Sequence, residues 1–225
     1  MNDSTIQSVA LSSSIKTYHQ FLFPETALYD GSEYPFNVYY SSPLSQGNPF
    51  FYSTSFDSGS ISYQGMIYQK VPLLYDVIKD ELLTNDPSGL YIIRLDKDKV
   101  DSFDLWGNHF IHVRGEGKAY VGLTPGFYEV LYSGPTAVYK IVIKKIKENG
   151  ASSVGLNTYA SNADIYFMKK GGVFYRVRSR KSIFSVFSDK KKGIQQIMRK
   201  NHLKLKKEMD GALLSIAHWL DGISD

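Results

Sequence analysis

Apolar and polar residues alternate along the middle of the chain with the two-residue period of a β-strand. The clearest runs are residues 60–69, 71–83, 90–96, 109–113, 119–123, 126–132 and 137–146. Clusters of Gly, Pro, Asn, Asp and Ser, which are typical of tight turns, separate many of these runs. The pattern therefore predicts six or more antiparallel strands joined by short turns. Sequential strands of this kind favour a meander that curls into a roll or an open barrel.

Helical spacing replaces this alternation at both ends of the chain. Apolar residues three and four apart predict a short N-terminal helix within residues 1–23. The same spacing recurs from Ile183 to Leu220, and Ser179 or Ser182 is suited to cap the first of these C-terminal helices. The expected fold class is α+β, mainly β: an antiparallel β domain at 24–178 and a basic helical segment at 179–225 packed on it.

Two irregular regions and one hairpin complete the expected organisation. Residues 24–59 are broken by turn residues, and the aromatic side chains between 50 and 56 are expected to order this region by packing on a sheet. The Gly, Ala, Ser and Asn residues at 148–162 predict a loop or weak linker. Residues 164–179 predict one more hairpin, which turns at Gly171 and Gly172.

The composition supports a β-rich core and excludes several types of functional site. Seventeen Tyr and thirteen Phe among 225 residues favour strands. The absence of Cys excludes disulfides, thiolate zinc sites and cysteine nucleophiles. No run approaches the roughly 20 apolar residues of a membrane-spanning helix. The polar start lacks the features of a secretory signal, so the expectation is either a cytoplasmic protein or one whose signal has been removed.

Charge is strongly segregated along the chain. Residues Lys169 to Lys207 hold fourteen Lys and Arg against one acid, Asp189, so the remaining residues carry a net −9 within a total of +4. Three interpretations stay open: a nucleic-acid surface, a patch facing an anionic membrane, or the solvated face of the C-terminal helices. The side chains expected to bind an anionic partner are Arg176, Arg178, Arg180, Lys181, Lys190, Lys191 and Lys192.

No catalytic motif accompanies this charge. His109 and His112 are three apart, so on a strand they face opposite sides and do not converge on a metal ion. Residues 115–122 lack the third glycine of a dinucleotide fingerprint, and no phosphate-binding loop is present. The sequence therefore predicts no metal and no cofactor. If the protein is an enzyme, the expected alternative is a hydrolase that uses the Asp and His groups at 96–112.

Several segments together resemble a known group of proteins. Residues 28–34, 48–76, 126–134 and 166–207, the last including the run Tyr175 to Lys181, are similar to an uncharacterised family of exported proteins found in Bacteroidetes. In that family a signal peptide precedes a β region punctuated by Gly and Tyr, and a Lys-rich helical end follows it. The resemblance implies export and brings no activity or catalytic residues.

The function expected from the sequence is thus an exported, non-enzymatic binding or structural protein of the cell envelope. Anionic lipid, polysaccharide or an envelope protein is the expected partner. Nucleic acid is a poor partner in the envelope, and polyanion or nucleic-acid binding through the basic segment is kept as a further alternative.

Overall fold

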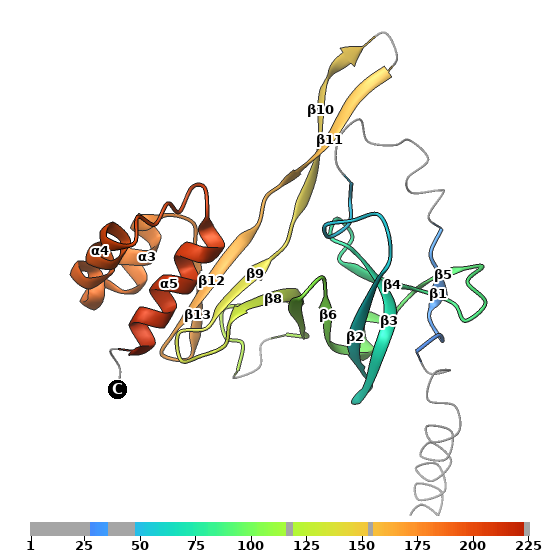
Figure 1. Cartoon of the computed structure of the whole chain (residues 1–225), viewed down its shortest axis with the longest axis horizontal. Coiled ribbons are helices and arrows are strands. Elements are labelled where there is room, and N and C mark those ends of the chain that lie inside the picture. Colours follow the sequence, from blue (N-terminus) through green and yellow to red (C-terminus); the bar gives the residue numbers. More distant parts are fainter. Residues whose placement is uncertain (1–27, 36–47, 116–118, 153–154, 223–225) are drawn as a thin grey trace, which may run out of the picture.

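The computed structural model describes residues 28–35, 48–115, 119–152 and 155–222, and for 146–160 it describes the backbone alone (Figure 1). Within these ranges the chain forms one large antiparallel sheet, a separate two-stranded sheet and three α-helices. The mainly β, α+β fold class is therefore confirmed. The helix predicted within residues 1–23 lies outside the described residues.

Eleven strands form the main sheet in the order β1-β5-β4-β3-β2-β6-β7-β8-β9-β12-β13. Their bounds are β1 Ser32–Glu33, β2 Asp57–Tyr63, β3 Met66–Asp76, β4 Glu81–Asn85, β5 Ile92–Arg94, β6 Val100–Leu105, β7 Asn108–Val113, β8 Gly126–Tyr132, β9 Val138–Ile141, β12 Ile165–Lys170 and β13 Val173–Val177. Most consecutive strands pair with each other, as a meander requires. The order changes at β6, which pairs with β2 after the short 3-10 helix η1 (Lys97–Lys99) instead of extending the sheet beyond β5.

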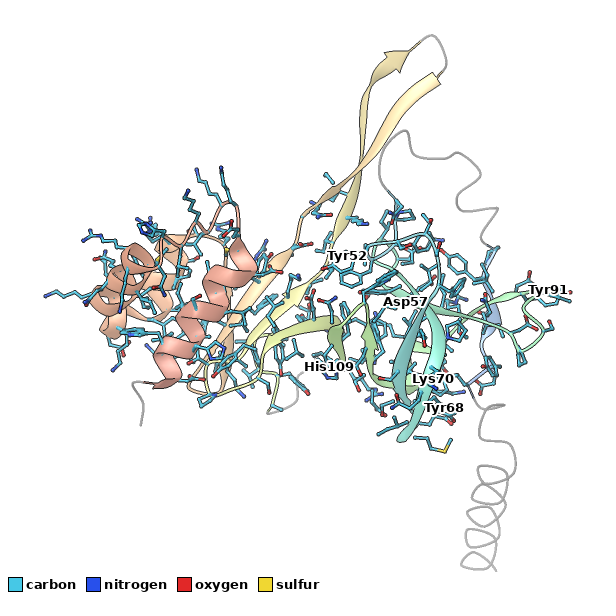
Figure 2. All side chains as sticks on the ribbon, in the orientation of Figure 1. Tyr52, Asp57, Tyr68, Lys70, Tyr91 and His109 are labelled. Carbon is cyan, nitrogen blue, oxygen red and sulfur yellow. The ribbon has the colours of Figure 1, made fainter. Side chains whose placement is uncertain are left out.

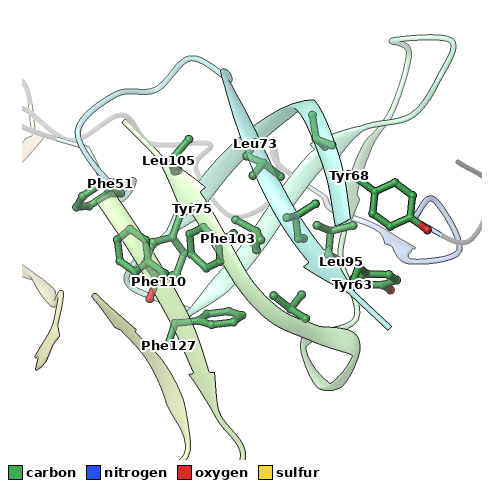
Figure 3. Packing of buried hydrophobic residues seen from close by; sticks show 14 of the residues in the cluster. Phe51, Tyr63, Tyr68, Leu73, Tyr75, Leu95, Phe103, Leu105, Phe110 and Phe127 are labelled. Carbon is green, nitrogen blue, oxygen red and sulfur yellow. The ribbon is translucent and has the colours of Figure 1, made fainter. Parts of the chain in front are cut away.

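Ring contacts show how strongly the first part of this sheet curls. Tyr75 of β3 and Phe127 of β8 have ring centroids 5.8 Å apart. Three strands lie between β3 and β8, so a flat sheet would separate these two strands by roughly 19 Å. The inner face therefore closes on an aromatic core that also contains Phe103 and Phe110 (Figure 3). The sheet order still runs from a β1 edge to a β13 edge, so the curled sheet stays open.

The predicted linker at 148–162 is wrong. Strands β10 (Lys144–Ser152) and β11 (Gly155–Asn162) pair with each other as a two-stranded antiparallel ribbon that projects from the sheet between β9 and β12 (Figure 1). Glycine, serine and asparagine are common in turns, and here they occur in paired strands because backbone hydrogen bonds across the ribbon decide the conformation.

The hairpin predicted at 164–179 is confirmed. Strands β12 and β13 pair in register, and the turn residues Gly171 and Gly172 adopt φ values of 57° and 83°. Two successive positive φ values match the twist of the flanking strands in a tight hairpin turn.

Three helices cover one face of the sheet at its β13 end. Their bounds are α3 Arg180–Val186, α4 Lys191–Lys200 and α5 Met209–Gly222, with the 3-10 helix η2 (Ser188–Lys190) between the first two. The predicted cap is confirmed, because the Ser179 hydroxyl accepts from the Ser182 amide in a capping box. Ile183, Ile194 and Leu213 are fully buried in one cluster with Met168 and Val177 of the sheet. The predicted apolar stripes therefore pack on the β domain.

A buried ionic cluster fastens α5 to the sheet. The Lys140 ammonium lies 2.8 Å from a carboxylate oxygen of Glu129 and 2.8 Å from one of Asp210. The Tyr166 hydroxyl donates to the other oxygen of Asp210 at 2.6 Å. Burial raises the pKa of Glu129. Burial opposes the charge of Lys140, yet its hydrogen bonds to Asp210 and Glu129 raise its pKa above the ordinary value.

Candidate basic groove

Two adjoining hollows lie where the last strand passes into the helical segment. The larger, of about 590 Å³, is lined by Arg178, Ser179, Arg180, Lys181, Leu203, Lys204, Leu205, Lys206 and Lys207. The smaller, of about 350 Å³, is lined by Arg180, Gln195, Met198, Arg199, His202, Leu203 and Lys204. Because Arg180, Leu203 and Lys204 line both hollows, we treat them as one feature and call it the basic groove.

Two segments, residues 178–181 and 195–207, form the walls of the basic groove. One wall is the junction of β13 and α3, where the Ser179 cap fixes the direction of the chain. The other is the connection between α4 and α5. There His202 adopts a φ of 51° and the amide of Leu203 donates to the Met198 carbonyl at 3.0 Å, which ends α4 with a sharp turn.

The floor of the groove is apolar. Leu203 and Leu205 are partly buried and pack against the core cluster beneath the helices. Their neighbours Lys204, Lys206 and Lys207 lie at the rim of the larger hollow. The groove therefore combines a hydrocarbon surface with a cationic border, and residues 203–207 contribute to both.

Seven cationic side chains line the two hollows, and no Asp or Glu does so among the residues that the structure describes. The seven are Arg178, Arg180, Lys181, Arg199, Lys204, Lys206 and Lys207. In the same described ranges, no carboxylate lies within 4.0 Å of any of the seven cationic groups, although Lys and Arg side chains elsewhere pair with carboxylates. Like charges held close together without counter-charges create a local positive potential that attracts anions.

A mixed-charge crevice elsewhere provides a useful contrast. It measures about 450 Å³ and has both acidic and basic lining residues. Its charges are matched within the protein: Arg94 pairs with Glu81 at 2.9 Å, and Lys97 pairs with Asp80. Positive charge without a protein partner is therefore a property of the basic groove and not of every hollow.

The structure groups three of the seven predicted binding residues in the groove and separates the other four. Arg178, Arg180 and Lys181 line it. Arg176 of β13 pairs with Phe167 of β12, so the two side chains lie on the same face of the sheet. Phe167 belongs to a core cluster on the face opposite the helices. Arg176 therefore points away from the groove. Lys190, Lys191 and Lys192 lie at the start of α4, outside both hollows.

Sequence reasoning did not select four cationic groove residues, Arg199, Lys204, Lys206 and Lys207, or the two leucines of the floor. The signal that could have found the second wall is the alternation of Leu and Lys at 203–206, directly after helix-like spacing. In the structure this run includes a turn, in which the Lys207 amide donates to the Lys204 carbonyl at 2.9 Å, and its leucines are partly buried while its lysines are exposed. The meeting of that segment with 178–181 depends on how α4 turns back, which no local pattern shows.

The Asp and His groups at 96–112 do not converge on one cleft. The Asp104 carboxylate accepts from the Ser60 hydroxyl at 2.6 Å and lies 2.7 Å from Nδ1 of His109, on the exposed face of β2, β6 and β7. Burial raises the pKa of Asp104, and the hydrogen bonds from Ser60 and His109 bring it below the ordinary value. Activation of a serine hydroxyl needs the imidazole between serine and carboxylate, and here the carboxylate is in the middle.

His112 faces the other side of the sheet, as its spacing from His109 predicts. It is 8% exposed, and its Nδ1 lies 3.2 Å from the Val100 carbonyl oxygen. Asp96 caps η1 and pairs with Lys99. The expectation that His109 and His112 face opposite sides of a strand is confirmed, and His112 is the buried one. Among the described residues, no three His, Asp or Glu side chains are grouped so as to hold a metal ion.

Comparison with protein-family models, with curated proteins and with solved structures finds no match to this chain. Within the described ranges, no helix is both long enough and apolar enough to cross a membrane.

Proposed function

We propose that the protein is a non-enzymatic binding protein of the cell envelope, which holds an anionic partner through the basic groove. The observation that carries the proposal is the set of seven cationic side chains around the groove, which are not neutralised by carboxylates in the described part of the chain. The envelope location is the part of the proposal that rests on the resemblance of residues 166–207 to an exported family, and all the residues that line the groove lie in this stretch.

Direct binding measurements test the groove with two matched variants. The groove variant combines Arg180→Gln, Lys204→Gln and Lys206→Gln. The control variant combines Lys190→Gln, Lys191→Gln and Lys192→Gln, which removes the same charge from the same helical segment outside both hollows. The ligands are vesicles with and without phosphatidylglycerol, polygalacturonate and duplex DNA.

We expect binding to the anionic vesicles, with a loss of up to about a hundredfold in the groove variant, since each cation near an anionic surface contributes roughly 1 kcal/mol. The control variant should retain most of the affinity. Equal losses in the two variants would show that total charge and not the groove is responsible, and the groove assignment would then be wrong. Absence of binding to every anionic ligand at low salt would overturn the proposed function itself.

A hydrolase site at 96–112 is the less favoured function. Asp104 and His109 are in contact, but the order of Ser60, Asp104 and His109 does not place an imidazole on the hydroxyl, and His112 is on the other face. The geometry therefore supports binding over catalysis.

A further inference from the structure

We propose that the occupant of the basic groove is a single anionic lipid, whose acidic group lies among the cations and whose hydrocarbon chain lies on Leu203 and Leu205. This inference rests on the proposed function and adds the chemical class of the ligand. It follows from three features of the groove: its cationic border, its apolar floor and, in the larger hollow, the lack of side-chain hydrogen-bond acceptors other than Ser179.

The first feature is the cationic border. Arg180 and Lys204 line both hollows, and Arg199 is added in the smaller one. Arginine presents a planar fork of donors that suits phosphate and carboxylate oxygens, and lysine adds a point charge. An acidic head group placed where the two hollows meet would contact cations from both walls.

The second feature is the hydrocarbon floor. Leu203 and Leu205 expose part of their surface to the larger hollow while the rest packs against the helical core. The methylene stems of the surrounding Lys and Arg side chains extend this apolar surface. A free inorganic anion would leave the floor in contact with water, whereas an alkyl chain attached to the anion would cover it.

The third feature separates a lipid from a peptide or a sugar. Lysine and arginine side chains donate hydrogen bonds and accept none, and leucine does neither. In the larger hollow the remaining side chain is Ser179, whose hydroxyl already accepts from the Ser182 amide. A peptide or a neutral sugar brings donors as well as acceptors, and its donors would find few side-chain partners there. A phosphate or carboxylate brings acceptors alone.

A chain-length series of alkyl phosphates tests this inference on the unmodified protein. Butyl, hexyl, octyl and decyl phosphate are titrated below the concentrations at which they form micelles, with inorganic phosphate and the neutral octyl glucoside as comparisons. Each added methylene that reaches the floor should tighten binding about three- to fourfold, equivalent to roughly 0.8 kcal/mol per buried methylene. The gain should stop once the chain extends beyond the hollow.

A second variant measures the contribution of the apolar floor to binding separately from that of the cationic border. Leu205→Ser should flatten the chain-length dependence while leaving the affinity for inorganic phosphate unchanged, and far-UV circular dichroism with thermal unfolding checks that the helical segment is intact. The groove variant should weaken every phosphate in the series by a similar factor.

The outcomes distinguish the inference from the proposed function. If affinity does not depend on chain length, while anionic vesicles or polygalacturonate still bind through the groove, the lipid inference is wrong and the proposed function stands. Groove-dependent binding of an acidic peptide, together with a flat alkyl series, would likewise overturn the lipid in favour of a protein partner. If no anion binds, both fail.

Discussion

At the scale of single residues, the same chemical group behaves differently according to the side of the sheet it faces. His109 is exposed and pairs with Asp104, whereas His112 is buried beside Phe127, with ring centroids 5.0 Å apart. Burial lowers the pKa of His112, and the nearby charges of Arg114 and Lys97 lower it further. The folded protein therefore holds His112 neutral in a pH range where an unfolded histidine takes up a proton.

This difference predicts a pH dependence of stability. As the pH falls below about 6.5, the unfolded state binds a proton at His112 and the folded state does not, so the free energy of unfolding should decrease by up to about 1.4 kcal/mol per pH unit. The loss should continue until the pH reaches the lowered folded-state pKa. His112→Gln should flatten this slope between pH 7 and pH 5 in urea unfolding experiments. His202→Gln, at an exposed position, is the control, and an unchanged slope in His112→Gln would contradict the argument.

At the scale of elements, the packing of α4 on α5 depends on the absence of a side chain at Gly193. A Cβ atom there would lie 2.1 Å from Cη2 of Trp219. Gly211 occupies the corresponding third position of α5, and a Cβ atom there would meet nothing within 4 Å. The two glycines have the same place in their helices and opposite surroundings.

Alanine at these two positions should have opposite effects. Gly211→Ala should raise the free energy of unfolding by up to about 1 kcal/mol, because alanine is the better helix former. Gly193→Ala should lower it by about 1–3 kcal/mol, because the Trp219 ring must move. Both are measured by urea unfolding in a Trp106→Phe background, where Trp219 fluorescence reports the interface. Stabilisation of equal size in both variants would show that the contact with Trp219 has no effect.

The elements also show what the sequence could predict. The hairpin at Gly171 and Gly172 has a local turn signal and is predicted correctly, and the cap is Ser179, one of the two serines that the sequence offers. The β10–β11 ribbon was missed because its residues favour turns and its strands depend on each other for pairing. The position of β6 beside β2 was also missed, because the curl of the sheet is set by long-range contacts such as Tyr75 with Phe127. The groove as a whole was missed for the same reason, because its two walls come together only when the chain folds.

At the scale of the whole molecule, two separate apolar cores pack on one face of the sheet, and further clusters lie on the opposite face. The aromatic core fills the curled end, and the second core lies beneath the helices at the β13 end. Figure 2 shows the helices and the curled end at opposite sides of the molecule. Between them lies the ionic cluster of Glu129, Lys140, Tyr166 and Asp210, with Glu129 and Lys140 only 3% and 5% exposed. Because the basic groove is built on the helical core, its shape depends on how firmly this cluster holds α5 to the sheet.

Removing the central charge of the cluster should loosen the helical end first. Lys140→Met leaves Glu129 buried without its cation, and breaking a buried pair in this way costs about 3–5 kcal/mol. The double variant Lys140→Met with Glu129→Leu should recover most of that loss, because a well-packed apolar pair is often as stable as a buried ion pair. Asp210 can then be hydrated, since 45% of its side chain is exposed.

Native-state hydrogen exchange locates the effect. In Lys140→Met, amides of α5 and β9 should exchange faster than amides of β2 and β3, because the aromatic core does not contain the cluster. Lys190→Met, which removes an exposed cation from the same helical segment, should change neither stability nor exchange appreciably. Uniform acceleration across both ends would mean that the two cores unfold as one unit. In that case a ligand in the basic groove would stabilise the entire sheet, and not the helical end alone.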